Sequence, residues 1–149
     1  MKWLTAMFLT VPALALAEPQ PWMKKEDPNE LAFAFSYGAP CNGVSGESVS
    51  RTAQDVIVRS RIKVAPLMSG KRYLLLRLWC TESGGLFLYR FDIDIAMLSS
   101  KHGLIRFGES SRGGYGLNDA EGLTADIKTR TESFVADYLR ANFDLDDND

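Results

Sequence analysis

The chain has 149 residues, of which 46% are hydrophobic, and its formal net charge is -2 at pH 7. This length and composition suit a globular protein with one hydrophobic core. Its 17 Lys and Arg residues are scattered and do not outnumber its 19 Asp and Glu residues, so a nucleic acid is not an expected partner.

The N-terminal segment 1–17 has the three parts of a secretory signal peptide. Lys2 supplies a positive charge, an apolar run extends from Trp3 to Leu16, and the small residues of an Ala-Leu-Ala sequence end at Ala17. The run is too short for a permanent membrane-spanning helix. We therefore expect cleavage after Ala17 and export, to the bacterial periplasm or outside the cell, with no stable membrane insertion of the mature chain.

We expect the next segment to be poorly packed and the one after it to form a β-strand. Residues 18–29 contain three prolines and five charges, which predicts an extended N-terminal arm with little packing, although its Trp22 and Met23 are candidates for docking on the domain. Leu31, Phe33 and Phe35 then alternate with smaller side chains, as in a first β-strand. A turn-rich loop follows.

Residues 47–65 fit two secondary structures. Val56, Val58, Ile62 and Val64 have the spacing of a strand, whereas opposite charges four residues apart favour a helix over 48–59. We favour the helix, capped by Ser45 or Ser48, followed by a short strand that ends before Pro66.

The stretches 73–82 and 86–98 form the clearest predicted hairpin, with a glycine-containing turn between them. Each strand has one apolar face and one mixed face, because alternate side chains point to opposite sides of a sheet. Residues expected on the apolar faces are Leu74, Leu76, Leu78, Cys80, Phe87, Tyr89, Phe91, Ile93 and Ile95.

A glycine-rich loop is expected over 108–116, after another short strand. A long amphipathic helix should follow, with Thr124 as its cap and Phe134 and Tyr138 on its apolar stripe. The acidic tail 144–149 lies beyond it. The predicted fold is a single α+β domain over 30–143, with a mostly antiparallel sheet of four to five strands and two helices packed on one face.

Cys41 and Cys80 are the two cysteines of the chain. Because exported proteins meet an oxidising environment, we expect a disulfide bond between them. Two separate buried thiols are the alternative. With His102 as the single histidine, far from either cysteine in the sequence, we expect neither a metal site nor a cofactor.

Asp92 and Asp94 are the acidic pair of the hairpin. A glycosidase-like pair needs two contrasting environments, but these residues lie about 7 Å apart on one strand in similar settings. We expect both on the exposed mixed face with Arg77 and Arg90, with pKa values near the ordinary range and no catalytic role. This face is a candidate surface for a protein partner.

The glycine-rich loop is a second candidate contact region. Arg112 and Tyr115 are residue types that often anchor protein interfaces. The loop lacks the Gly-Lys-Ser/Thr ending of a phosphate-binding loop, although its glycines leave room for an anion.

The favoured function is therefore that of an exported, non-enzymatic binding or accessory protein that contacts another protein of the cell envelope. Immunity and inhibitor proteins belong to this class. The alternative is a small periplasmic hydrolase that acts on a cell-wall or glycan substrate, which would require a deep pocket with convergent titratable groups.

Overall fold

The computed structural model describes residues 21–39, 41, 43–68, 70–84, 86–107 and 114–143. The predicted leader 1–17, the acidic tail 144–149 and Arg112 lie outside these residues.

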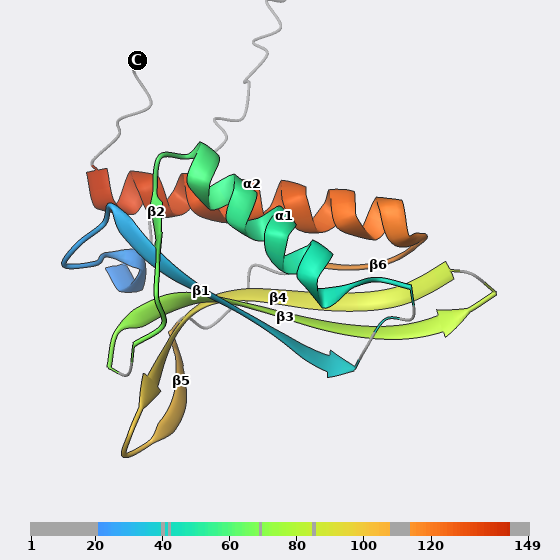
Figure 1. Cartoon of the computed structure of the whole chain (residues 1–149), viewed down its shortest axis with the longest axis horizontal. Coiled ribbons are helices and arrows are strands. Elements are labelled where there is room, and N and C mark those ends of the chain that lie inside the picture. The colour runs from blue at the N-terminus through green and yellow to red at the C-terminus, as the bar shows by residue number, and fades with distance from the viewer. Residues whose placement is uncertain are drawn as a thin grey trace, which may run out of the picture.

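Two helices lie on one side of a six-stranded sheet, as Figure 1 shows. This arrangement confirms the predicted α+β class and the placement of both helices on one face, with one strand more than expected. The strands are β1 (Glu30–Ala39), β2 (Lys63–Ala65), β3 (Arg72–Ser83), β4 (Leu86–Ser99), β5 (Gly103–Phe107) and β6 (Gly114–Asn118), and the helices are α1 (Gly46–Arg59) and α2 (Ala120–Phe143).

The sheet is mixed. Its strand order is β2-β1-β3-β4-β5, and β6 pairs with the other end of β4. β1 runs parallel to β2 and β3, while β4 is antiparallel to β3, β5 and β6. The parallel pairs arise because α1 crosses over between β1 and β2 and returns the chain in the same direction.

The β3–β4 hairpin confirms the predicted strands and their faces. Leu74 is opposite Ile95, and Leu76 is opposite Ile93, in the antiparallel register. These side chains are buried and form part of one core cluster with Phe134 and Tyr138 of α2. The apolar faces of both strands therefore lie beneath the helices, as strand alternation predicts.

Strand β6 occupies part of the region predicted as a loop. Gly114–Asn118 pairs with Phe87–Phe91 of β4. A Cβ atom on Gly116 would lie 2.6 Å from the Tyr89 hydroxyl, and one on Gly114 would lie 3.0 Å from the Phe91 ring. These two glycines thus allow a strand to pack closely over aromatic rings, which is why the prediction of a loop was wrong for residues 114–116.

Both helices begin earlier in the sequence than predicted. Ser45 caps α1, and its side chain accepts a hydrogen bond from the Ser48 amide at 3.4 Å, so one of the two expected caps is confirmed. Thr124 does not cap α2. The Asp119 side chain instead accepts a hydrogen bond from the Gly122 amide at 2.8 Å, and it satisfies one of the free N–H groups of the first turn.

The described part of the N-terminal segment is packed and not extended, contrary to the prediction from its prolines and charges. Pro21–Met23 forms a 3-10 helix, and Met23 is fully buried. Asn142 of α2 donates to the Met23 carbonyl at 3.1 Å and accepts from the Lys25 amide at 2.8 Å. The apolar Met23 side chain and this amide pair together hold the segment on the end of α2.

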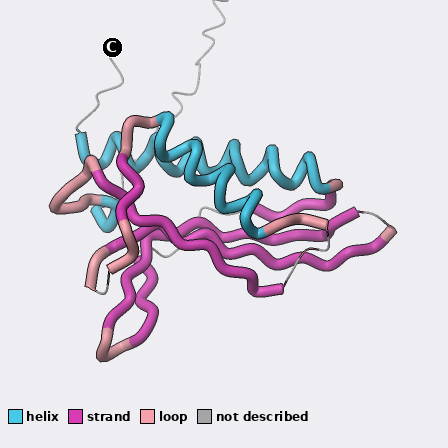
Figure 2. Tube along the Cα trace, in the orientation of Figure 1, coloured by secondary structure: helices cyan, strands magenta, loops and turns pink. Residues whose placement is uncertain are grey.

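The sheet is strongly curled, and the β4–β5 hairpin turns away from the helices (Figure 2). β5 therefore lies on the side of the sheet away from the helices. We call the sheet face on that side the open face.

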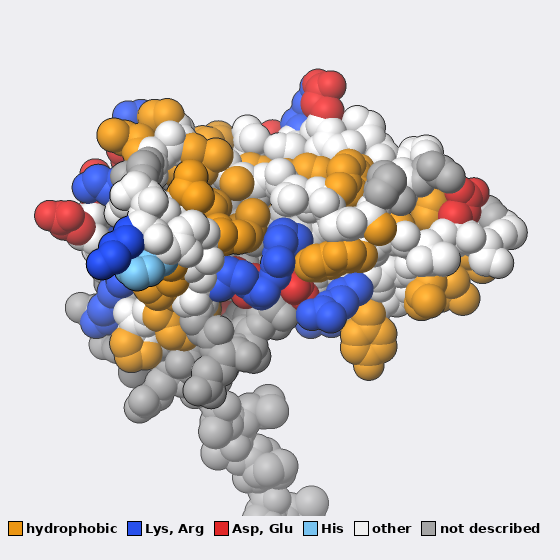
Figure 3. Space-filling model, turned by 90° about the horizontal axis from the view of Figure 1, so that it is seen from below, with side chains coloured by type: hydrophobic (Ala, Val, Ile, Leu, Met, Phe, Trp, Pro, Cys, Tyr) orange, Lys and Arg blue, Asp and Glu red, His pale blue; other side chains and the backbone are white. Residues whose placement is uncertain are grey.

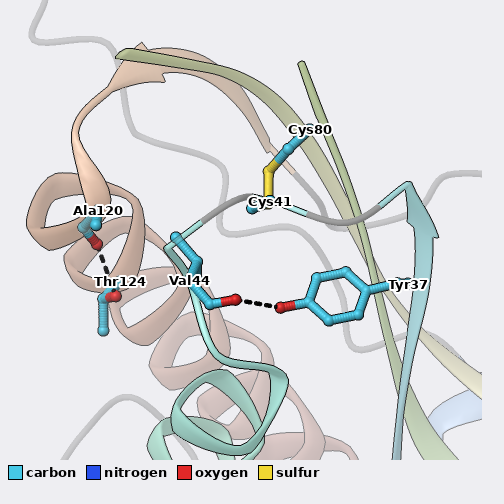
Figure 4. The surroundings of a disulfide bond; sticks show 6 residues. All are labelled: Tyr37, Cys41, Val44, Cys80, Ala120 and Thr124. Carbon is cyan, nitrogen blue, oxygen red and sulfur yellow. Dashed lines mark hydrogen bonds between the residues drawn. A yellow bond between two sulfur atoms is a disulfide. The ribbon is translucent and has the colours of Figure 1, made fainter. Parts of the chain in front are cut away.

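A disulfide bond joins Cys41, in the segment after β1, to Cys80 of β3, with a Cα–Cα distance of 5.0 Å (Figure 4). It confirms the predicted pairing. In the same region the Tyr37 hydroxyl donates to the Val44 carbonyl at 2.7 Å. These two contacts fix the connection between β1 and α1 against the sheet.

Candidate functional site

The open face gathers residues from four strands. Arg77 of β3 is opposite Asp92 of β4, and Trp79 is opposite Arg90. Because directly opposed residues point to the same side of a sheet, their side chains share the open face. Seen from below, basic side chains cluster near the middle of this face, with small areas of acidic side chain visible between them and hydrophobic side chains around them (Figure 3).

Asp92 and Asp94 are on the predicted face, but the expectation that they are exposed is wrong. Their exposed fractions are 2% and 4%. Arginine side chains lie over them, and Leu75 and Ala96 belong to a small second apolar cluster on this side of the sheet. Strand alternation fixes the side to which a residue points, but not what covers that side.

Three arginines surround the two carboxylates. Arg77 lies 3.4 Å from Asp92 and 4.0 Å from Asp94. Arg90 donates to both oxygens of Asp92, at 3.2 and 3.4 Å. The third arginine, Arg106, pairs with Asp94 and lies 3.7 Å from Asp92. Such pairing is needed because a buried carboxylate without a partner costs several kcal/mol.

The electrostatics of Asp94 also differ from the prediction. Burial raises the pKa of Asp94 above its ordinary value of 3.8, and the Arg106 guanidinium acts in the opposite direction. Burial disfavours the charged form of a carboxyl group, whereas a nearby cation favours it. For Asp94 the burial is the larger effect.

The arginines remain partly accessible. The Arg90 side chain is 66% exposed and the Arg106 side chain is 37% exposed. A guanidinium has five N–H donors, and the ion pairs with Asp92 and Asp94 occupy only some of those on Arg90 and Arg106. The carboxylates are therefore enclosed, while the outer edges of two guanidinium groups face solvent.

Apolar side chains border the arginines. Arg77 and Arg90 stack over the Trp79 ring, at 5.1 and 5.6 Å from its centroid. Leu88 is opposite Leu117, and Arg90 is opposite Tyr115, in the pairing of β4 with β6. Leu88, Leu117 and Tyr115 are all exposed, Tyr115 to 86%. We call the following set the open-face patch: Arg77, Trp79, Leu88, Arg90, Arg106, Tyr115 and Leu117.

The structure thus brings together five of the predicted contact residues, Arg77, Arg90, Asp92, Asp94 and Tyr115. Arg106 also belongs to the open-face patch, but the sequence did not identify it as a contact residue. Alternation in 103–107 places Arg106 on one face of its strand, but only the pairing of Ala96 with Arg106 reveals that it reaches the acidic pair.

Elsewhere among the described residues, a hollow and the single histidine are weaker candidates for a catalytic or metal site. A hollow of about 880 Å³ lies beside the 24–30 and 65–72 segments. Its described lining has four basic and three acidic side chains, and none of Ser, Thr, Cys, Tyr or His. His102 is exposed in the turn before β5. Within the described residues, no group of three or more His, Cys, Asp or Glu is placed to hold a metal ion.

Among the helices of the described residues, none has the length and apolar character needed to cross a membrane. The chain matches no protein-family model and no curated protein sequence.

Proposed function

We propose that the protein is an exported, non-enzymatic binding or accessory protein that contacts another cell-envelope protein through its open-face patch. The observation that supports this most directly is the exposure of Leu88, Tyr115 and Leu117 beside partly free arginines. Aromatic residues and arginine are enriched where protein interfaces concentrate their binding energy. An inhibitor or immunity role would belong to this proposed class.

Export is supported by the sequence of the leader and by the Cys41–Cys80 bond. Disulfide bonds persist in oxidising compartments such as the periplasm and are rare in the cytosol. The proposed partner therefore belongs to the envelope or the extracellular space.

The hydrolase alternative has one observation in its favour, the raised pKa of the buried Asp94, since a general acid needs such a shift. The enclosure of that carboxylate by Arg106 and Arg77 opposes it, because a substrate must reach the acid. Asp94→Asn separates the two functions, since it would abolish hydrolysis but leave Leu88 and Tyr115 available to a partner.

Capture from an envelope extract tests the proposal. Immobilised mature protein is compared with Leu88→Ser and Tyr115→Ser, and with Val58→Ser as a matched control. Val58 is exposed on α1, in the helical layer on the other side of the sheet. We expect proteins quantified by mass spectrometry to be retained by wild type and Val58→Ser and lost from the two patch variants. Equal retention by all four would contradict the proposal.

A further inference from the structure

We infer that the open-face patch receives an extended acidic segment of its partner, in which an Asp or Glu lies two residues from a large apolar side chain. This inference rests on the proposed function and names the chemistry of the partner. The charge, the rigidity and the spacing of the patch all favour such a segment.

The charge of the patch favours an anionic group. Three arginines face two aspartates, so the five described side chains have an excess of one positive charge. The outer edges of Arg90 and Arg106 are accessible, whereas both carboxylates are enclosed. A partner therefore meets cations first. Arginine binds a carboxylate through two parallel N–H bonds, which adds directional preference to the attraction.

The guanidinium groups are held in place before any partner arrives. Arg90 forms two hydrogen bonds to Asp92 and stacks on Trp79, and Arg77 stacks on the same ring. Side chains that are already ordered lose less conformational entropy on binding. The buried aspartates thus act as positioning residues for the exposed arginines.

The spacing of the patch favours an extended segment. Leu88 and Arg90 are two residues apart on β4, which corresponds to about 7 Å along a strand. Their cross-strand neighbours are Leu117 and Tyr115, so the apolar and cationic positions each extend over two strands. Residues i and i+2 of an extended peptide have the same separation, so one can pair with Arg90 while the other packs on Leu88 and Leu117.

A flat anionic membrane is a poorer fit to the same surface. The β4–β5 hairpin projects on the side of the open face, so a planar bilayer would meet this hairpin before it reached the patch. The patch also offers only two well-exposed guanidinium groups, Arg90 and Arg106, whereas adsorption on anionic lipid increases with the number of basic residues near the surface.

Selection from a library of random short peptides on the immobilised mature protein tests this inference. We expect the selected peptides to be enriched in an Asp or Glu two residues from Leu, Ile, Phe, Tyr or Trp. Changing that acidic residue to Gln or Asn in the peptide should weaken its binding to the protein by about tenfold or more. Added salt should weaken the binding of the unchanged peptide. The change in the peptide leaves the protein intact, so folding cannot confuse the result.

Protein variants complete the test. Arg90→Gln should weaken the binding of the acidic peptide by a similar factor. The variant should still fold, because Asp92 keeps Arg77 and Arg106 as partners. Arg51→Gln is the matched control, because Arg51 is an exposed arginine of α1 that pairs with Glu47. It should leave peptide binding unchanged. Circular dichroism confirms that each variant is folded before its affinity is compared.

The outcomes separate the inference from the proposed function. Selected peptides that lose binding to Leu88→Ser but tolerate the acid-to-amide change would overturn the acidic segment and leave the binding surface in place. Peptides unaffected by Leu88→Ser, or no selected peptide at all, would overturn the inference, while the capture experiment decides the proposed function on its own. Sedimentation with phosphatidylglycerol vesicles that is lost in Leu88→Ser, without peptide binding, would replace the peptide with a membrane.

Discussion

Arg77 and Asp92 are directly opposed on β3 and β4, and a guanidinium nitrogen of Arg77 lies 3.4 Å from a carboxylate oxygen of Asp92. The Asp92 side chain is 3% exposed and the Arg77 side chain is 22% exposed. This pair lies at the inner end of the arginine cluster, whereas Arg90 lies at its outer, solvated end. Stability and recognition should therefore depend on different arginines.

Replacing the inner arginine should destabilise the fold. Arg77→Met leaves part of the buried negative charge uncompensated, so we expect a loss of about 2 to 3 kcal/mol in the free energy of unfolding. Arg90→Met is the comparison, and it should cost less than about 1 kcal/mol because this side chain is largely solvated. Urea unfolding at neutral pH measures both. Equal losses of unfolding free energy in the two variants would mean that the deeper burial of Arg77 does not make it more important for stability than Arg90.

Asp94 should make the stability of the protein depend on pH. Because its folded pKa is raised above 3.8, the folded protein holds the Asp94 proton more tightly than the unfolded chain does. Its contribution is fully present below 3.8 and is lost as the pH rises through the folded pKa. The free energy of unfolding of Asp94→Asn should therefore rise relative to wild type between acidic and neutral pH. A relative fall over this range would show that ion pairing outweighs burial.

The Tyr89 hydroxyl should contribute to stability in alkaline solution. It donates to Asp126 at 2.6 Å, and burial together with this bond raises the pKa of Tyr89 to about 12. The contribution is fully present below pH 10.0 and is lost as the pH rises towards 12. Tyr89→Phe should cost about 1 to 3 kcal/mol at neutral pH and reduce the loss of stability over this alkaline range. Tyr115→Phe, at an exposed position, should change neither quantity; an equal effect there would refute the assignment.

The disulfide should be a major source of stability. Cys41 and Cys80 are separated by 39 residues, and closing a loop of this length stabilises a fold by about 4 kcal/mol in the chain-entropy account. The double change Cys41→Ala and Cys80→Ala should lower the free energy of unfolding by about this amount. Thiol titration of denatured, unreduced wild-type protein should detect no free thiol. Two thiols per chain would contradict the bond, and reduced protein provides the positive control.

Local signals in the sequence predicted much of the fold. Strand alternation placed Phe91 and Ile93 in the core and Asp92 and Asp94 on the other face, because successive side chains of a strand point to opposite sides. The position of Ser45 before a helical charge pattern located a cap, and the two cysteines of an expected exported chain gave the disulfide. Each of these inferences depends on neighbouring residues or on a simple pairing choice.

The sequence predicted the pairing of β3 with β4, but only the tertiary structure decided which other strands are neighbours, and the candidate site depends on those pairings. The pairing of β5 with β4 brings Arg106 onto Asp94, and the pairing of β6 with β4 places Tyr115 beside Arg90. The burial of the acidic pair follows in part from such pairings, because Arg77 and Arg106, which cover it together with the nearby Arg90, come from the two strands beside β4. Periodicity determines the face of a side chain, whereas its exposure is set by the long-range packing of other strands over that face.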